Sequence, residues 1–340
     1  MEPVMLTQYD AVPPGLLELP AARLGEVLPG PALIHLPGRR TQPLFASVLL
    51  HGNEDTGWLA AQSVLKKYAT AELPRALSLF IGNVEAARTG QRRLDGQPDY
   101  NRVWPGSEEV HPPERAMMQQ VVDAMRARDV FASIDIHNNT GLNPHYACVN
   151  RLDQDFLHLA TLFSRIVVYF IRPRGVQSAA FAELCPAVTL ECGKPGTPGS
   201  VEHAAMFMEA CLHLSEFPAH PVAPHDVDLF HTVATVKVPD QVSFGFVAPD
   251  ADIDFVPELD HYNFRELKHG DLLGRVRPGS PARLQALDEH GAEIGDRLFD
   301  YSRGEITLRK PLMPAMLTRD ERVIRQDCLC YLMERIKTPA

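Results

Sequence analysis

Two histidines and a glutamate stand where apolar runs of this 340-residue chain end. His51 and Glu54, three positions apart in "HGNE", follow the run "LFASVLL" (44–50), and His137 closes the run "VFASIDIH" (130–137). Open α/β sheets bind their ligands at the carboxyl ends of strands. A catalytic zinc ion takes three protein ligands and keeps a fourth position for water. By spacing alone, the three side chains are either metal ligands or solvated residues of strand ends and loops.

Two further carboxylates lie near the ends of expected strands. Asp135 and His137 are two positions apart, so in a strand both side chains point to the same face. An imidazole that binds a metal commonly donates its other N–H to a carboxylate, and Asp135 is either that partner or is bonded to local backbone. Glu191 lies near the end of "PAVTLEC" (186–192). Apolar neighbours raise the pKa of a carboxyl group, which suits a general acid or base; the alternative is a lone acid paired with Lys194.

Polar residues between these strands have the chemistry to hold an anion or polarise a carbonyl. Asn101 and Arg102 lie in "DYNRVWPG". Arg binds a carboxylate through two parallel hydrogen bonds, and Asn adds a further donor. The dipeptide alone is equally consistent with an ordinary surface loop. Upstream, "TGQRRLD" supplies Arg92 and Arg93 as candidates to polarise a carbonyl, and the sequence does not indicate which of them faces the site.

Apolar runs alternate with helical patterns through the first two thirds of the chain. The expected strands are 31–36, 44–50, 76–82, 130–137, 165–171 and 186–192. Several are continuously apolar, which is typical of buried strands in a mainly parallel sheet. The expected helices are 56–69, 112–129 and 153–165. The second begins at Pro112 and Pro113, as helix N-termini often do. This alternation predicts an α/β fold.

The composition of the chain changes from about residue 217. The proline- and histidine-rich stretch 217–228 is typical of a linker or domain boundary. The β-like runs beyond it, separated by Pro, Gly and Asp, are 231–238, 243–248, 271–276 and 304–310. The last stretch, 320–337, is either a strand or a helix. We therefore predict a catalytic domain over 1–222 and a smaller β-rich C-terminal domain over 223–340.

Composition excludes several classes of protein. A net charge of -10 leaves no electrostatic footprint for nucleic acid, so an anionic substrate needs a local cluster of Arg or Lys. No apolar run approaches the roughly 20 residues that a membrane span needs. The first residues have no basic stretch followed by an apolar one, so we do not expect a signal peptide. The six cysteines form no CxxC pair. We expect them to be reduced and mostly buried, as in a cytoplasmic enzyme.

Taken together and in this order, "HGNE", "DYNRVWPG", "DIHNNTG" and "LECG" resemble the succinylglutamate desuccinylase/aspartoacylase family of the wider zinc carboxypeptidase group. The resemblance spans roughly residues 45–200, and 261–276 resembles the small β domain that these enzymes append. It implies a mixed, mainly parallel central sheet flanked by helices, with a smaller C-terminal β-rich domain. The chain departs from the family at Tyr100, where Leu is usual, and after His137 and Glu191, so acyl-group specificity does not carry over.

The resemblance also implies a role for each matching residue. His51, Glu54 and His137 would be the ligands of one zinc ion per chain. Glu191 would activate the zinc-bound water and then protonate the leaving amine. Arg92 fits the family's Arg-x-x-Asp pattern through "RRLD" and would polarise the scissile carbonyl.

For the substrate, the resemblance implies contacts from Asn101 and Arg102, which would grip its carboxylate. Asn138 and Asn139 directly follow the ligand histidine, and from this position we expect them to shape the substrate pocket. These roles describe a zinc-dependent amidohydrolase that deacylates an N-acyl amino acid. The alternatives are a zinc metallocarboxypeptidase and a zinc-binding scaffold without turnover, against which the presence of Glu191 argues. We expect a small-molecule carboxylate substrate, no nucleic-acid or membrane partner, and a monomer or a homo-oligomer.

Overall fold

The computed structural model describes residues 5–108 and 110–339, which divide into two compact units. The first unit runs to Asn138, resumes at His145–Leu229 and includes the chain from Lys337 onward; the second comprises Asn139–Pro144 and Phe230–Ile336. Each unit therefore includes a short segment that lies, in the sequence, within or beyond the other unit. A single boundary in the sequence cannot describe this division. The predicted domain limits, 1–222 and 223–340, stay predictions. Within the described part of the chain, no helix is both long and apolar enough to cross a membrane.

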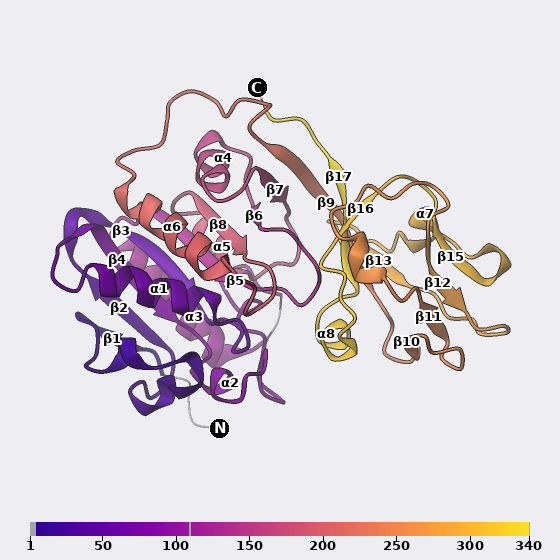
Figure 1. Cartoon of the computed structure of the whole chain (residues 1–340), viewed down its shortest axis with the longest axis horizontal. Coiled ribbons are helices and arrows are strands. Elements are labelled where there is room, and N and C mark those ends of the chain that lie inside the picture. The colour runs from indigo at the N-terminus through magenta and orange to yellow at the C-terminus, as the bar shows by residue number, and fades with distance from the viewer. Residues whose placement is uncertain (1–4, 109, 340) are drawn as a thin grey trace. The chain divides into compact units, whose positions relative to one another are not determined.

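A single mixed sheet forms the centre of the first unit (Figure 1). Its strands run in the order β1-β2-β4-β3-β5-β8-β6-β7. Their bounds are β1 Thr7–Tyr9, β2 Ala32–Leu36, β3 Gly38–Val48, β4 Leu73–Ile81, β5 Ala132–His137, β6 Tyr146–Val149, β7 Ile166–Tyr169 and β8 Ala187–Glu191. β3 pairs in parallel with β4 and β5, and β5 with β8, whereas β2 and β6 run antiparallel to β4 and β8. Because β3, β5 and β8 are parallel neighbours, their carboxyl ends meet at one edge of the sheet.

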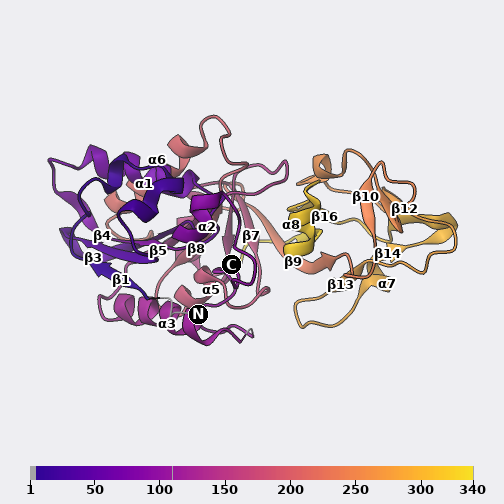
Figure 2. The same cartoon turned by 90° about the horizontal axis from the view of Figure 1, so that it is seen from below.

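Helices cover both faces of this sheet. Their bounds are α1 Thr56–Lys67, α2 Val84–Thr89, α3 Pro112–Arg126, α4 Gln154–Thr161, α5 Gln177–Phe181 and α6 Ser200–His213, with 3-10 turns at Leu16–Glu18 and Ala21–Glu26. α1 and α6 pack side by side on one face, and α3 lies on the other (Figure 2). The predicted fold class, a mainly parallel sheet flanked by helices, is confirmed for this unit.

Each strand and helix predicted for this region is present, with shifted ends. The largest shift is at β3, which begins at Gly38 and stops at Val48 because Leu49 has a positive φ of 56°. The helix expected over 153–165 ends at Thr161. Strands β1 and β6 and helices α2, α5 and α6 were not predicted. All of these except α6 have six residues or fewer, which is too short for a clear period.

The second unit is rich in short strands, as predicted. Its elements are β9 Asp228–Lys237, β10 Phe244–Phe246, β11 Ile253–Phe255, β12 Leu272–Val276, β13 Gln285–Leu287, β14 Phe299–Asp300, β15 Glu305–Leu308, β16 Met313–Ala315 and β17 Cys330–Arg335, with helices α7 Gly295–Leu298 and α8 Glu321–Gln326 and 3-10 turns at Leu259–Tyr262 and Ser302–Gly304. One sheet has the order β10-β11-β12-β15-β14, and β9 pairs with β13 and β17. The stretch 320–337, which the sequence left as a strand or a helix, contains both α8 and β17.

All six cysteines are buried and form no disulfide, as expected. Burial raises the pKa of the thiols of Cys185, Cys192, Cys211 and Cys330 far above the usual range. These thiols are therefore protonated apolar groups of the core rather than reactive side chains.

The loop between β3 and α1 passes very close to the backbone of α2. A Cβ atom on Gly52 would lie 2.2 Å from the Ala87 nitrogen and 2.3 Å from the Ala86 carbonyl carbon. The Gly52 N–H donates to the carbonyl oxygen of Arg92 at 3.1 Å. The glycine of "HGNE" is therefore required by close packing of two backbones, and this packing fixes the residues on either side of it.

We predict that Gly52→Ala lowers the free energy of unfolding by about 1–3 kcal/mol, because the added methyl group meets backbone that cannot rotate away. The urea unfolding midpoint measures this loss. Gly25→Ala is the matched control, since a Cβ there lies 4.0 Å from its nearest neighbour, Val84. Equal midpoints for the two variants would mean that the loop relaxes without cost.

Candidate active site

The structure brings His51, Glu54 and His137 together at the carboxyl edge of the sheet of the first unit. All three are buried, and each offers one ligand atom within 4.8 Å of the other two. His51 Nδ1 lies 2.9 Å from Glu54 Oε1, and His137 Nδ1 lies 2.7 Å from Glu54 Oε2. The same nitrogen of both imidazoles therefore faces the same carboxylate.

The second nitrogen of each imidazole faces a different carboxylate. His137 Nε2 lies 2.8 Å from Asp135 Oδ2, and Asp135 in turn accepts a hydrogen bond from the Ser47 hydroxyl. His51 Nε2 lies 2.9 Å from Asp99 Oδ1. A carboxylate at Nε2 holds the proton there and leaves the lone pair of Nδ1 available to a metal. The role considered for Asp135 from strand spacing therefore agrees with its position.

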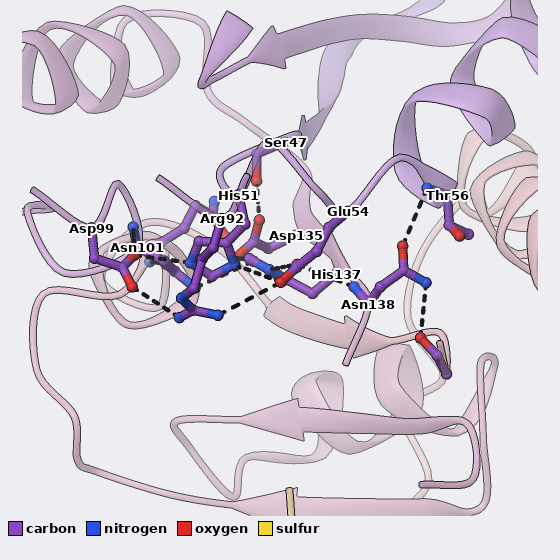
Figure 3. A network of polar contacts seen from close by, with 12 residues as sticks. Ser47, His51, Glu54, Thr56, Arg92, Asp99, Asn101, Asp135, His137 and Asn138 are labelled. Carbon is purple, nitrogen blue, oxygen red and sulfur yellow. Dashed lines mark hydrogen bonds and ion pairs between the residues drawn. The ribbon is translucent and has the colours of Figure 1, made fainter. Parts of the chain in front are cut away.

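Asp99 connects three parts of the site (Figure 3). Besides facing His51, it accepts hydrogen bonds from the backbone N–H of Asn101 at 2.8 Å and from Arg92 Nη2 at 2.8 Å. Arg92 Nη1 lies 3.6 Å from Glu54 Oε1, which closes a ring of four charged or polar side chains. The Arg92 guanidinium is thus held between two carboxylates.

Mutual attraction in this buried cluster shifts the pKa values of its members. Burial would lower the pKa of His137, but the charges of Asp135 and Glu54 outweigh it and raise that pKa well above the usual range. Burial and Arg92 act to lower the pKa of His51, whereas Glu54 and Asp99 raise it more. Burial would raise the pKa of Glu54, but the two imidazoles hold it below the usual range. The carboxylates therefore favour the positively charged, protonated form of both imidazoles.

This donor set fits a divalent cation. Two imidazole nitrogens and a carboxylate are the ligands of many catalytic zinc sites, which leave a further position open. The carboxylates of Glu54, Asp99 and Asp135 contact the two imidazoles, and the Arg92 guanidinium contacts Glu54 and Asp99. A metal ion satisfies the same demand for positive charge as protons on the two rings. The triad could therefore bind a metal.

Of the two candidate arginines, Arg92 faces the cluster. Arg93 Nη1 instead donates to the carbonyl oxygen of Gln97 at 2.7 Å. Asn101 is buried, with Nδ2 3.2 Å from His137 Nε2 and Oδ1 accepting from the Gln177 N–H at 2.9 Å. Arg102 follows it and donates from Nη1 to the Asn101 carbonyl at 2.9 Å. The structure thus brings Arg92 and Asn101 to the cluster, with Arg102 adjacent.

The two asparagines after His137 belong to different units. Asn138 is the last residue of the first stretch of the first unit, and its N–H donates to Glu54 Oε2 at 3.1 Å. Asn139 belongs to the second unit, where its Oδ1 accepts a hydrogen bond from Asn143 at 3.2 Å. Asn138 therefore contacts the cluster directly, through Glu54.

Glu191 lies beside the cluster at the end of β8. It is paired in parallel register with His137, so the two side chains stand on the same face of neighbouring strands. Glu191 is buried, and across β6 it is in register with Tyr146. The sheet therefore sets a carboxylate one strand away from a histidine of the candidate metal site.

Sequence reasoning missed Asp99. Asp99 lies two positions before Asn101 in "DYNRVWPG", whereas the Arg-x-x-Asp pattern matched through "RRLD" has Asp95 as its acid. Asp95 is exposed, whereas Asp99 is buried. No local feature of the sequence distinguishes the two acids, because the burial of Pro98, Asp99 and Tyr100 is visible only in the folded structure.

The fold and the cluster together define an α/β protein with a candidate metal site at the carboxyl edge of a mixed sheet. The family model of the succinylglutamate desuccinylase/aspartoacylase catalytic domain matches residues 44–214. The chain therefore belongs to the succinylglutamate desuccinylase/aspartoacylase family, and the resemblance inferred from the four motifs is confirmed. No curated protein matched the chain.

Solved structures share the fold at low sequence identity. The succinylglutamate desuccinylase from Chromobacterium violaceum has a TM-score of 0.57 at 17% identity, over 89% of this chain and 87% of that one. The one from Vibrio cholerae has a TM-score of 0.58 at 13% identity, over 87% and 82%. Murine aminoacylase 3 has a TM-score of 0.56 at 13% identity, over 88% and 98%. These matches establish the fold.

We predict that Asp99→Asn weakens zinc binding about 10- to 100-fold, because the neutral amide no longer fixes the proton on His51 Nε2. Competition with a chromophoric chelator measures the affinity. Asp95→Asn removes the exposed acid four residues away in the same loop and should bind zinc as the wild type does. If Asp99→Asn also bound normally, His51 would not depend on Asp99 for its orientation.

Proposed function

We propose that the protein is a zinc-dependent amidohydrolase that removes the acyl group from an N-acyl amino acid. Membership of the desuccinylase/aspartoacylase family supports this class of reaction. The substrate is a small molecule with a free carboxylate, which the acidic chain would recognise through local arginines.

One observation carries the proposal: a His–Glu–His cluster fit for zinc stands one strand away from a buried carboxylate. His51, Glu54 and His137 converge within 4.8 Å, and Glu191 is in register with His137. Metal-assisted amide hydrolysis needs a Lewis acid and a proton carrier that both reach the same water. The parallel register of β5 and β8 supports this arrangement, because it sets Glu191 directly beside the candidate ligand His137.

Zinc held by the triad would lower the pKa of water and polarise the scissile carbonyl. Glu191 would accept the proton of the attacking water on its carboxylate and later donate it to the departing amide nitrogen. Its burial beside the sheet restricts its motion and excludes bulk water. The same carboxylate therefore serves as base and then as acid within one turnover.

The arginines of the site would act on different parts of the substrate. Arg92, which donates a hydrogen bond to Asp99, would stabilise the negative charge that develops on the carbonyl oxygen. Arg102 and Asn101 would hold the substrate carboxylate and so determine which amide bond lies at the metal. Asp99 accepts hydrogen bonds from both Arg92 and the Asn101 backbone N–H. These bonds would fix the distance between the group that stabilises the carbonyl oxygen and the groups that hold the carboxylate.

The first test incubates the zinc-loaded protein with a mixed pool of N-acyl amino acids and short peptides, followed by mass spectrometry. Release of acyl groups from the N-acyl amino acids supports the proposal and names the substrate class. Release of C-terminal residues from the peptides would make the protein a metallocarboxypeptidase instead. Binding of zinc without any product would favour the scaffold.

Glu191→Gln should lower kcat about 10²- to 10⁴-fold, the usual contribution of a general acid–base group, and leave zinc affinity within about threefold of the wild type. Product release and metal content are measured on the same sample. Glu202→Gln, an exposed acid in the first turn of α6, is the matched control. Turnover by Glu191→Gln at the control's rate would remove Glu191 from the mechanism.

Arg102→Ala should lower kcat/KM for N-acyl amino acids about 10- to 100-fold, the equivalent of one lost charge-assisted hydrogen bond. The corresponding N-acyl amino acid amides, which lack the free carboxylate, should be cleaved equally by the variant and the wild type. An equal loss with acids and amides would show that Arg102 does not recognise the carboxylate.

A further inference from the structure

Asn138 joins three segments that carry the chemistry of the site. It follows β5 directly and is 2% exposed. Its Nδ2 donates to the carbonyl oxygen of Gly193 at 2.9 Å, and its Oδ1 accepts from the N–H of Thr56 at 3.2 Å. Both ends of the carboxamide are therefore bonded to backbone. This bonding favours a structural role for the Asn138 side chain over direct contact with a substrate.

Each of these bonds reaches a segment next to a functional carboxylate. Thr56 is the first residue of α1 and lies two positions after Glu54, and the Asn138 N–H itself donates to Glu54. Gly193 lies two positions after Glu191 and has a positive φ of 71°, so the chain turns sharply there. Cys192, between them, donates from its N–H to the His137 carbonyl at 2.9 Å. Asn138 thus ties the turn after Glu191 to the loop that carries Glu54.

We propose that Asn138 is a positioning residue that sets the separation between the metal ligand Glu54 and the proton carrier Glu191. This inference rests on the proposed function, since the roles of Glu54 as metal ligand and Glu191 as proton carrier belong to that mechanism. Backbone hydrogen bonds between β5 and β8 hold the residues of these strands in register up to His137 and Glu191. The last backbone hydrogen bond described between the two segments runs from the Cys192 N–H to the His137 carbonyl. Beyond that point the Asn138 carboxamide connects the two segments by its bond to Gly193. It also bonds to Thr56, the first residue of α1, a helix that lies outside the strand ladder.

The chain offers a matched control in Asn150. This asparagine directly follows β6 and donates from Nδ2 to the carbonyl oxygen of Phe170 at 3.0 Å, so it also links two strand ends through backbone. Because β6 runs antiparallel to β8, Asn150 lies at the opposite edge of the sheet from Glu191. Asn150→Ala therefore removes a similar bond without touching the site.

The first measurement compares Asn138→Ala with Asn150→Ala in the full-length, zinc-loaded protein. We expect Asn138→Ala to lower kcat about 10- to 100-fold, keep KM within about threefold, and weaken zinc binding about tenfold. Asn150→Ala should keep kcat and zinc affinity even if its unfolding midpoint falls as much. A raised KM with unchanged kcat and zinc affinity would make Asn138 a substrate ligand and overturn the proposal, as would equal losses in both variants.

A double-mutant cycle tests whether Asn138 acts through Glu191. In the Glu191→Gln background, Asn138→Ala should cost less than about threefold in residual kcat, because the group that it positions is already disabled. The same fold loss in both backgrounds would overturn the coupling.

Zinc affinity keeps this inference separate from the proposed function. If the wild-type protein cleaves none of the N-acyl substrates, the proposed activity fails. The comparison of zinc affinity between Asn138→Ala and Asn150→Ala can still be made in that case, by chelator competition without substrate. Equal affinities would then overturn the link between Asn138 and Glu54, and a selective loss in Asn138→Ala would support it.

Discussion

The buried carboxylate of Glu54 is the group on which the site depends. One of its oxygens faces His51 Nδ1, and the other faces both His137 Nδ1 and the N–H of Asn138. A buried charge is costly unless each of its oxygens has a partner. Those partners come from the loop after β3 and from the end of β5, so satisfying one carboxylate requires these two strand ends to be held at a fixed distance.

The same requirement explains the packing around the "HGNE" loop. Gly52 lets the loop lie directly on the backbone of α2, and Asp99 fixes the outer side of His51. Neither contact adds a candidate ligand. Both restrict the position of His51, so that its imidazole approaches Glu54 through Nδ1.

The sequence was sufficient to predict which residues lie together at the ends of neighbouring strands. His51, His137 and Glu191 follow or end apolar runs, and the carboxyl ends of parallel strands meet at one edge, so their proximity follows from the fold class. Glu54 follows from its spacing to His51. The predicted sheet and flanking helices were found for the same reason, since long apolar runs carry a strong signal.

The remaining parts depend on contacts between segments distant in the sequence. Nothing local indicates that Asp99 rather than Asp95 reaches Arg92, since the choice depends on which acid the loop buries. The carboxamide of Asn138 bonds to Thr56 and Gly193, which are 82 and 55 residues away. The early end of β3 depends on the positive φ of Leu49, a conformation that leucine rarely adopts.

The burial of all six cysteines bears on how metal and folding are linked. Thiolate sulfur is a strong ligand for zinc, but a buried, protonated thiol binds poorly. Unfolding releases these six groups together with the histidines, so the unfolded chain becomes a competitor for the same ion. Metal that binds both states stabilises the folded one by less than its affinity for the folded site implies. Thermal shifts with zinc would therefore understate the affinity of the candidate site for zinc, and a gain in melting temperature would be a lower bound on that affinity.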